Sequence, residues 1–313
     1  MSRASIPCEV EAVRSQCKHG PRGAAAALEA SAQERIVKVA RLVRHFIEEP
    51  RDCSYLQSVK ASLEYRLMVD VTPGELEELL VRGWRRFGPA YFRPACMPCG
   101  ECHSIRLDVH RFEPTTSQRR ALKRSTRFRV EMGRPRIDAD RLTLHQSWHG
   151  TREDARGWEP TQLTEDEYAT QFAFPSSTGR EMAWYDGNRL VALGLVDVTP
   201  NCFSAAYFFY HPDIARLSPG IGNVMSCVEM ARELGCQHMY LGYRVRDCAS
   251  LTYKGYFQPH EVLVGRPAMH EPVSWKEAPV IAHLQKGASS SPGGGGSSKE
   301  DDDAEDEGGS SPR

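Results

Sequence analysis

Hydrophobic residues recur at helical spacing behind four separate signals for a helix start. The segment Thr72–Glu75 is a capping box with proline in the first turn, and a stripe of leucines follows it. This pattern predicts a helix that ends near Gly83. Two more capping boxes predict helices over about 115–127 and 164–174, and an amphipathic run closed by glycine predicts a fourth over 222–234.

The second half of the chain contains the clearest strand patterns. Arg189–Val198 and Phe203–Tyr210 are rich in β-forming residues and are separated by a short turn that contains Pro200, which predicts a hairpin. His238–Tyr243 and Glu261–Val264 add two more strands. The resulting order of strand, strand, helix, strand, loop and strand predicts an α/β domain built on a mixed sheet.

The same patterns divide the chain into four parts. Residues 1–40 show no apolar periodicity, and residues 286–313 are rich in glycine and serine and then acidic, so both ends are predicted to be disordered. Between them we expect a smaller, cysteine-containing N-terminal domain over 41–130 and a C-terminal catalytic domain over 131–285. The predicted fold class is therefore α/β (α+β).

Composition narrows the class of protein. The chain has 313 residues, of which 40% are hydrophobic and 26% charged, as in ordinary soluble globular proteins. No apolar run approaches the ~20 residues of a membrane span, and the N-terminus lacks the apolar core of a signal peptide. Ten cysteines in such a chain predict reduced thiols or metal ligands in the cytoplasm.

The charge is unevenly distributed along the chain. The net charge is −1, but the acidic tail hides a body, residues 1–285, that carries +3. Residues 119–136 contain eight basic side chains and a single acid. This density suits contacts with nucleic-acid phosphates, although a solvated helix face has the same composition.

Three cysteines follow the pattern Cys96-x-x-Cys99-x-x-Cys102, and Cys53 is a candidate fourth ligand. Two intervening residues allow neighbouring sulfurs to converge, so the set could hold zinc or an iron–sulfur cluster. The alternative interpretation is four plain thiols. Separately, Gly220 and Gly222 lie at the start of the fourth predicted helix, where backbone N–H groups can bind an anion, but a proline–glycine turn has the same appearance.

Ten short segments occur in a fixed order between about residues 42 and 265. They are Asp52–Leu56, Leu63–Arg66, Arg82–Gly88, Phe92–Arg106, Phe112–Arg120, Val196–Val198, Ala206–Pro212, Glu229–Gly235, Leu241–Tyr243 and Tyr253–Phe257. As an ordered set they resemble the arginyl-tRNA–protein transferase family, in its bacterial form that adds leucine to N-terminal Asp or Glu.

The resemblance implies a GNAT-like catalytic domain that uses aminoacyl-tRNA where an acetyltransferase uses acetyl-CoA. The α-amine of a protein N-terminus would attack the ester that joins the amino acid to tRNA. Leucine is the favoured donor and arginine the next. Because this ester is already activated, the chemistry requires no cofactor, only alignment, proton removal and oxyanion stabilisation. The implied partners are aminoacyl-tRNA and proteins that begin with Asp or Glu, which the reaction marks for N-degron degradation; DNA and membranes are not expected.

We assign three catalytic candidates within this framework. Asp197 is the expected base or amine-orienting carboxylate, although an aspartate before Thr199 could equally cap a turn. Tyr207 and Tyr210 must point to opposite faces of their strand, so at most one of them faces the substrate.

The binding candidates are cationic or hydrogen-bonding residues. Lys254 and Tyr243 could donate to acyl or phosphate groups, and Arg106 or Arg119 could neutralise an acidic acceptor. The full set expected to bind substrate or tRNA is Arg106, Gln118, Arg119, Arg120, Arg124, Tyr243 and Lys254.

Two other functions compete with this interpretation. An acyl-CoA-dependent N-acetyltransferase would share the fold, but it has no need for the basic segment or the cysteines. A non-enzymatic RNA-binding metal module would use the cysteines and arginines, and it would leave the C-terminal domain without a role.

Overall fold

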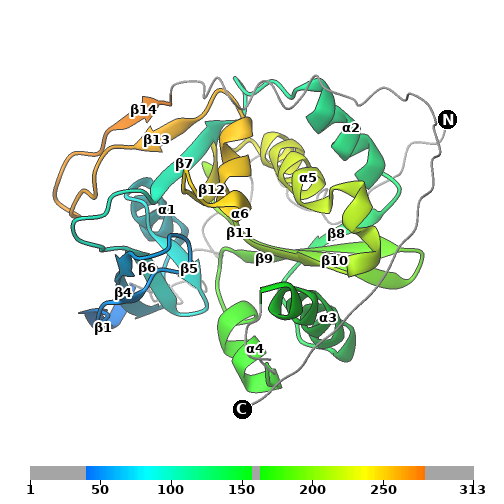
Figure 1. The fold of residues 1–313 in the computed structure, drawn as a ribbon, viewed down its shortest axis with the longest axis horizontal. Coiled ribbons are helices and arrows are strands. Elements are labelled where there is room, and N and C mark those ends of the chain that lie inside the picture. Colours follow the sequence, from blue (N-terminus) through cyan, green and yellow to red (C-terminus); the bar gives the residue numbers. More distant parts are fainter. Residues whose placement is uncertain (1–39, 157–162, 279–313) are drawn as a thin grey trace, which may run out of the picture. The chain divides into compact units, whose positions relative to one another are not determined.

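A computed structural model describes residues 40–156 and 163–278, and its centre is an eight-stranded sheet (Figure 1). The strands lie in the order β14 (Trp275–Glu277), β13 (Glu261–Leu263), β7 (His103–Asp108), β12 (His238–Arg244), β11 (Cys202–Tyr210), β10 (Arg189–Val198), β9 (Gly179–Asp186) and β8 (Arg129–Gly133). β11 and β12 are parallel, whereas the other neighbouring pairs in this sheet are antiparallel. The predicted mixed-sheet α/β class is confirmed.

The predicted hairpin is also confirmed, as β10 and β11. Val198 pairs with Phe203, and the backbone N–H of Thr199 donates to the carbonyl of Cys202 across the turn. β9, on the other side of β10, carries fewer sequence signals and was not predicted.

A four-stranded antiparallel sheet precedes the large one in the sequence. Its order is β1 (Arg41–Ile47), β4 (Leu63–Val69), β6 (Ala90–Pro94) and β5 (Arg85–Phe87). Between β1 and β4 in the sequence, β2 (Arg51–Asp52) and β3 (Lys60–Ala61) pair with each other as a separate two-stranded ladder. These strands were not predicted, because charged residues interrupt their apolar alternation.

The four predicted helices are present. They are α1 (Pro73–Val81), α2 (Thr116–Ser125), α4 (Glu165–Phe172) and α5 (Pro219–Glu233), and the first three begin with complete capping boxes. α5 begins three residues before the predicted start at Gly222, because Pro219 fits the first turn of a helix. α3 (Ala139–Arg156), α6 (Ala249–Thr252), and the 3-10 turns η2 (Pro212–Leu217) and η3 (Tyr253–Tyr256) were not predicted.

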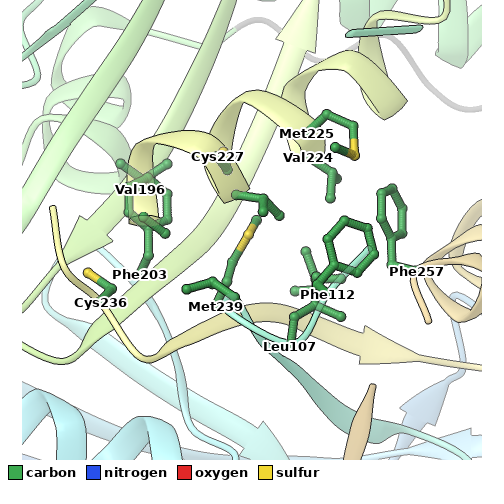
Figure 2. Packing of buried hydrophobic residues seen from close by; sticks show 14 of the residues in the cluster. Leu107, Phe112, Val196, Phe203, Val224, Met225, Cys227, Cys236, Met239 and Phe257 are labelled. Carbon is green, nitrogen blue, oxygen red and sulfur yellow. The ribbon is translucent and has the colours of Figure 1, made fainter. Parts of the chain in front are cut away.

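Helices cover both faces of the large sheet: α5 and α2 lie on one side, and α3 and α4 on the other (Figure 1). Figure 2 shows the core under α5, where Val224 and Cys227 of the helix face Phe203 and Met239 of the sheet. Ala121 is buried and Leu122 packs against this core, as predicted, so the charged side chains of α2 point outward.

The boundary predicted at residue 130 falls inside β8. β7, which belongs to the predicted N-terminal domain, lies within the large sheet between β13 and β12. The two predicted domains therefore share one sheet. The predicted disordered segments lie outside the described residues, except for Ala40. Within the described ranges, no helix has the length and apolar character needed to cross a membrane.

Candidate active site at the end of the parallel strand pair

The parallel strands β11 and β12 pair over only three residues and then separate. Cys202–Ser204 of β11 lies opposite His238–Tyr240 of β12, and the register of β12 against β7 shifts just beyond, at Gly242. Ligand sites of open sheets form outside the carboxyl ends of parallel strands, because the strands diverge there. This divergence is therefore the first place to look for a reaction centre.

Arg85 of β5 reaches into the divergence. Its Nη2 atom donates to the carbonyl oxygen of Ala205, the first β11 residue beyond the paired segment. The side chain is buried, with 7% of Arg85 exposed, and its Nη1 atom has no hydrogen-bond partner among the described residues. Burial lowers the pKa of this guanidinium, which nevertheless stays charged at neutral pH.

Lys254 of η3 brings a second cation to the same place. A Cβ atom built on Gly242 would lie 3.3 Å from Nζ of Lys254 and 3.6 and 3.7 Å from Nε and Nη2 of Arg85. Both cations therefore lie within 3.7 Å of one point beside β12. Burial, with Arg85 as the second cause, lowers the pKa of Lys254 to about 7.

Asp197 of β10 lies nearby in a buried ion pair. Its carboxylate accepts from Nε and Nη2 of Arg86 and, at 2.9 Å, from the hydroxyl of Thr178. The side chains of Asp197 and Arg86 are 3% and 11% exposed. Asp197 therefore accepts from three donors on two oxygens, and its part as the base or amine-orienting carboxylate stays a prediction.

Tyr207 and Tyr210 face opposite sides of β11, as predicted. Tyr207 packs into the apolar cluster under α3 and α4, whereas Tyr210 packs against the cluster that contains Trp184. The Tyr207 hydroxyl lies 2.9 Å from Nε2 of His149 on α3, a residue to which the sequence assigned no role. A catalytic part for either tyrosine stays a prediction.

Three predicted binding residues are engaged in internal contacts, contrary to expectation. Arg106 pairs with Glu261 at 2.7 Å, and the Tyr243 hydroxyl donates to the carbonyl of Gly83 at 2.8 Å. Gln118 is buried at the start of α2 and donates to the carbonyl of Tyr256 at 3.1 Å. These side chains contact the protein's own strands and turns, and a binding role for them stays a prediction.

The residues that build this site come from four of the ordered segments, 82–88, 196–198, 241–243 and 253–257. The sequence singled out Lys254, but it missed Arg85, Arg86 and Gly242 although all three lie in those segments. Side chains from segments far apart in the sequence therefore meet at one place in the fold.

Two family models match most of the described chain. Residues 51–120 match "Arginine-tRNA-protein transferase, N terminus", and residues 140–264 match "Arginine-tRNA-protein transferase, C terminus". An aspartate/glutamate leucyltransferase of Helicobacter hepaticus is 33% identical over 237 residues, which cover 75% of this chain and 98% of that protein. The chain belongs to the arginine-tRNA–protein transferase family.

Another aspartate/glutamate leucyltransferase, from Campylobacter jejuni, is 30% identical over 227 residues, covering 72% of this chain and 95% of the relative. Among solved structures, FemX is 10% identical; the matched part covers 57% of this chain and 62% of the FemX chain, with a TM-score of 0.35. At that score the likeness supports no conclusion. Family membership makes the protein an aminoacyl-tRNA–protein transferase, in preference to the acetyltransferase and the RNA-binding module.

The transferase presents a basic face on α2, formed by Arg119, Arg120, Lys123 and Arg124. All four side chains are exposed, and none forms an ion pair within the described ranges. Arg124 also donates to the carbonyl of Leu217 at 3.1 Å, so α2 lies against the start of α5. There, a Cβ on Gly222 would lie 2.0 Å from Oγ of Ser125, so this glycine allows the two helices to pack closely.

The cysteines predicted to bind metal lie near one another without forming a ligand set. Cys53, Cys96, Cys99 and Cys102 are free thiols, and burial followed by the charges of the other three raises the pKa of Cys102 to about 12. No group of three or more His, Cys, Asp or Glu side chains in the described residues is arranged to hold a metal ion. A metal or cluster at these four thiols stays a prediction.

Proposed function

We propose that this transferase moves leucine from leucyl-tRNA to the N-terminal amine of proteins that begin with Asp or Glu, marking them for N-degron degradation. The observation that carries the proposal is that the chain aligns with 95–98% of the length of relatives named aspartate/glutamate leucyltransferase. The free thiols of the eight described cysteines fit a cytoplasmic location.

The charges at the candidate site favour leucine over arginine as the donor. Arg85 and Lys254 are cations, and the carboxylate of Asp197 is held by Arg86 and Thr178. A donor bound beside this site would bring one positive charge, its α-amine, as leucyl-tRNA and a second, on its side chain, as arginyl-tRNA, so the arginyl donor would meet more repulsion.

The reaction needs only proximity and proton transfer. The acceptor's α-nitrogen forms a bond to the leucyl carbonyl carbon, the bond from that carbon to the ribose oxygen of the terminal adenosine breaks, and the proton lost by the amine goes to the leaving oxygen. The ester supplies the driving force, so the enzyme's part is alignment and stabilisation of the oxyanion.

To test donor and acceptor together, transfer to otherwise identical peptides beginning with Asp, Glu or Ala is measured with leucyl-tRNA, arginyl-tRNA or acetyl-CoA. We expect leucyl-tRNA to be used on the Asp and Glu peptides about a hundredfold faster than arginyl-tRNA. Equal use of the two tRNAs would contradict the donor assignment, and acetylation alone would contradict aminoacyl transfer.

We further propose that the α2 basic face binds phosphates of the tRNA. Replacing Arg119, Arg120 and Lys123 by glutamine should weaken tRNA binding by about tenfold to a hundredfold near 0.1 M salt, because phosphate contacts release counterions. The slope of log affinity against log salt should fall by about 2–3. Filter binding of tRNA over a salt series measures both quantities.

A matched triple variant at Arg41, Arg44 and Arg189, which are exposed residues outside α2, serves as the control. It removes the same charge from the protein, and it should leave the salt slope unchanged. An equal loss of affinity in both triple variants would mean that net charge, and not the α2 face, attracts the tRNA.

We propose that no cofactor takes part in the chemical step, because the aminoacyl ester is already activated. Treating the purified protein with a strong chelator should therefore leave the rate constant for transfer within about twofold of the untreated value. Elemental analysis accompanies the rate measurement. If the chelator abolished transfer and zinc or iron restored it, this proposal would be contradicted. The predicted metal site at Cys53, Cys96, Cys99 and Cys102 would then be supported.

A further inference from the structure

Arg85 and Lys254 are two cations held side by side, with no carboxylate of the described residues in contact with either. No carboxylate oxygen of the described residues lies within 4.0 Å of either charged group. Asp197 is the acid whose charge acts on Arg85, and its oxygens accept from Arg86 and Thr178. Enclosing like charges together costs free energy unless an anion joins them, so this arrangement indicates an anionic ligand.

Both cations are at least partly withdrawn from solvent. Arg85 is 7% exposed, and its Nη1 atom is buried with no hydrogen-bond partner among the described residues. Lys254 is half-buried, on the turn η3 that follows α6. Gly242, with a φ of +83°, has no side chain that would separate the two cations.

We propose that Arg85 and Lys254 form the pocket for the side-chain carboxylate of the acceptor's N-terminal residue. The proposal rests on the proposed transfer to Asp and Glu, and it assigns the acceptor preference to two residues. Because both cations lie within 3.7 Å of one point beside Gly242, the two oxygens of a single carboxylate could bridge them.

The other groups of the reaction fit this pocket less well. The leucyl donor has an uncharged side chain and a cationic amine, which two cations would repel. A tRNA phosphodiester carries a bulky nucleoside on each side, and Arg85 is almost fully enclosed. An Asp or Glu carboxylate is separated from the α-carbon by only one or two methylene groups, so binding it places the attacking amine close by.

This assignment replaces the two arginines that the sequence suggested for the acidic residue. Arg106 is paired with Glu261 at 2.7 Å and lies over the ring of Trp275. Arg119 is exposed on α2, and it donates to the carbonyl of Pro114.

The test is direct binding of peptides that begin with Asp or Asn and are otherwise identical, measured by titration calorimetry with the full chain. Wild-type protein should bind the Asp peptide about a hundredfold more tightly. Lys254→Met should reduce this preference by at least about tenfold, because one charged hydrogen-bond donor is lost, and should leave Asn-peptide binding unchanged. Lys276→Met removes an exposed lysine of β14 and should change neither affinity.

Arg85→Lys provides a second variant that retains the charge at a buried position. It loses the planar fork that binds two carboxylate oxygens at once, so it should also reduce the Asp preference. Its folding is checked by thermal unfolding, since Arg85 also donates to Ala205.

The pH dependence gives an independent readout. The groups that act on Lys254 are Arg85 from β5 and Cys248 just before α6, and burial with Arg85 lowers the pKa of Lys254 to about 7. Tyr243 of β12 acts on Arg85. Because the protonated form of Lys254 declines above that pH, the Asp-over-Asn preference should decline as well; the peptide amine titrates identically in both peptides and cancels.

The outcomes separate this proposal from the proposed function. Equal binding of both peptides to wild-type protein, or an unchanged preference in Lys254→Met, would overturn the pocket. Selective binding of the Asp peptide through Lys254 without leucine transfer would support the pocket and refute the donor assignment. A parallel loss of Asp and Asn binding in Lys254→Met would show that the residue supports the fold or the donor, and would also overturn the pocket.

Discussion

Replacing Gly88 by alanine is expected to destabilise the protein by about 3 kcal/mol or more. Gly88 forms the turn between β5 and β6, with a φ of +54°, and an added Cβ would lie 1.9 Å from the carbonyl oxygen of Thr170 on α4. That oxygen belongs to the backbone and cannot rotate away, so the turn or the helix must move. Urea unfolding of wild type and variant measures the difference.

Gly187→Ala is the matched control for this prediction. Gly187 also has a positive φ, of +60°, but nothing lies within 4 Å of the position of its Cβ. This variant should lose only the conformational cost of about 1 kcal/mol. Equal losses in the two variants would mean that the contact between the β5–β6 turn and α4 contributes nothing beyond backbone strain.

The Gly88 substitution should also affect activity, because the turn follows Arg85 and Arg86 directly. A displaced β5 would move Arg85 away from Ala205 and weaken binding of the acceptor's carboxylate. The expected result is a raised KM for an Asp peptide at temperatures where the variant is still folded.

Asp197→Asn is expected to cost about 3–5 kcal/mol of stability, because it leaves the buried guanidinium of Arg86 without its counterion. Asparagine retains one acceptor oxygen, and its amide group would oppose the N–H groups of Arg86. Glu277→Gln, which breaks the exposed pair with Arg111, should cost less than about 1 kcal/mol under the same conditions.

The double variant Arg86→Met with Asp197→Leu separates a positioning role from proton transfer. Replacing both members of a buried ion pair by apolar residues is often nearly neutral, so stability should largely return. If Asp197 serves to position Arg86, leucine transfer should return in part with the fold. If the double variant is stable but its rate constant for transfer stays as low as that of Asp197→Asn, the positioning role is contradicted and Asp197 is favoured as the base.

The elements that could be predicted from the sequence are those specified by local chemistry. Thr72, Thr115 and Thr164 each satisfy backbone N–H groups of the turn that follows, so their helices start at the predicted residues. α3 lacks such a capping box, and the strands of the four-stranded sheet are short or mostly exposed. Their formation depends on tertiary packing that a local pattern does not record.

The candidate site shows the same division. Lys254 and the stretch that contains Arg85 belong to the ordered segments, so the sequence pointed to both. The contact of these two side chains beside Gly242 depends on how β5, β12 and η3 pack. The internal partners of Arg106 and Tyr243 could not be predicted for the same reason, since Glu261 and the Gly83 carbonyl come close to them only in the folded chain.

The most direct measurement is the N-terminal sequence of peptides recovered from one reaction that contains leucyl-tRNA, arginyl-tRNA and four peptides beginning with Asp, Glu, Asn and Ala. Mass spectrometry of the products reads donor and acceptor together. We predict that leucine is added ahead of Asp and Glu and that the Asn and Ala peptides stay unmodified. Arginine in place of leucine, or equal modification of the Ala peptide, would contradict it.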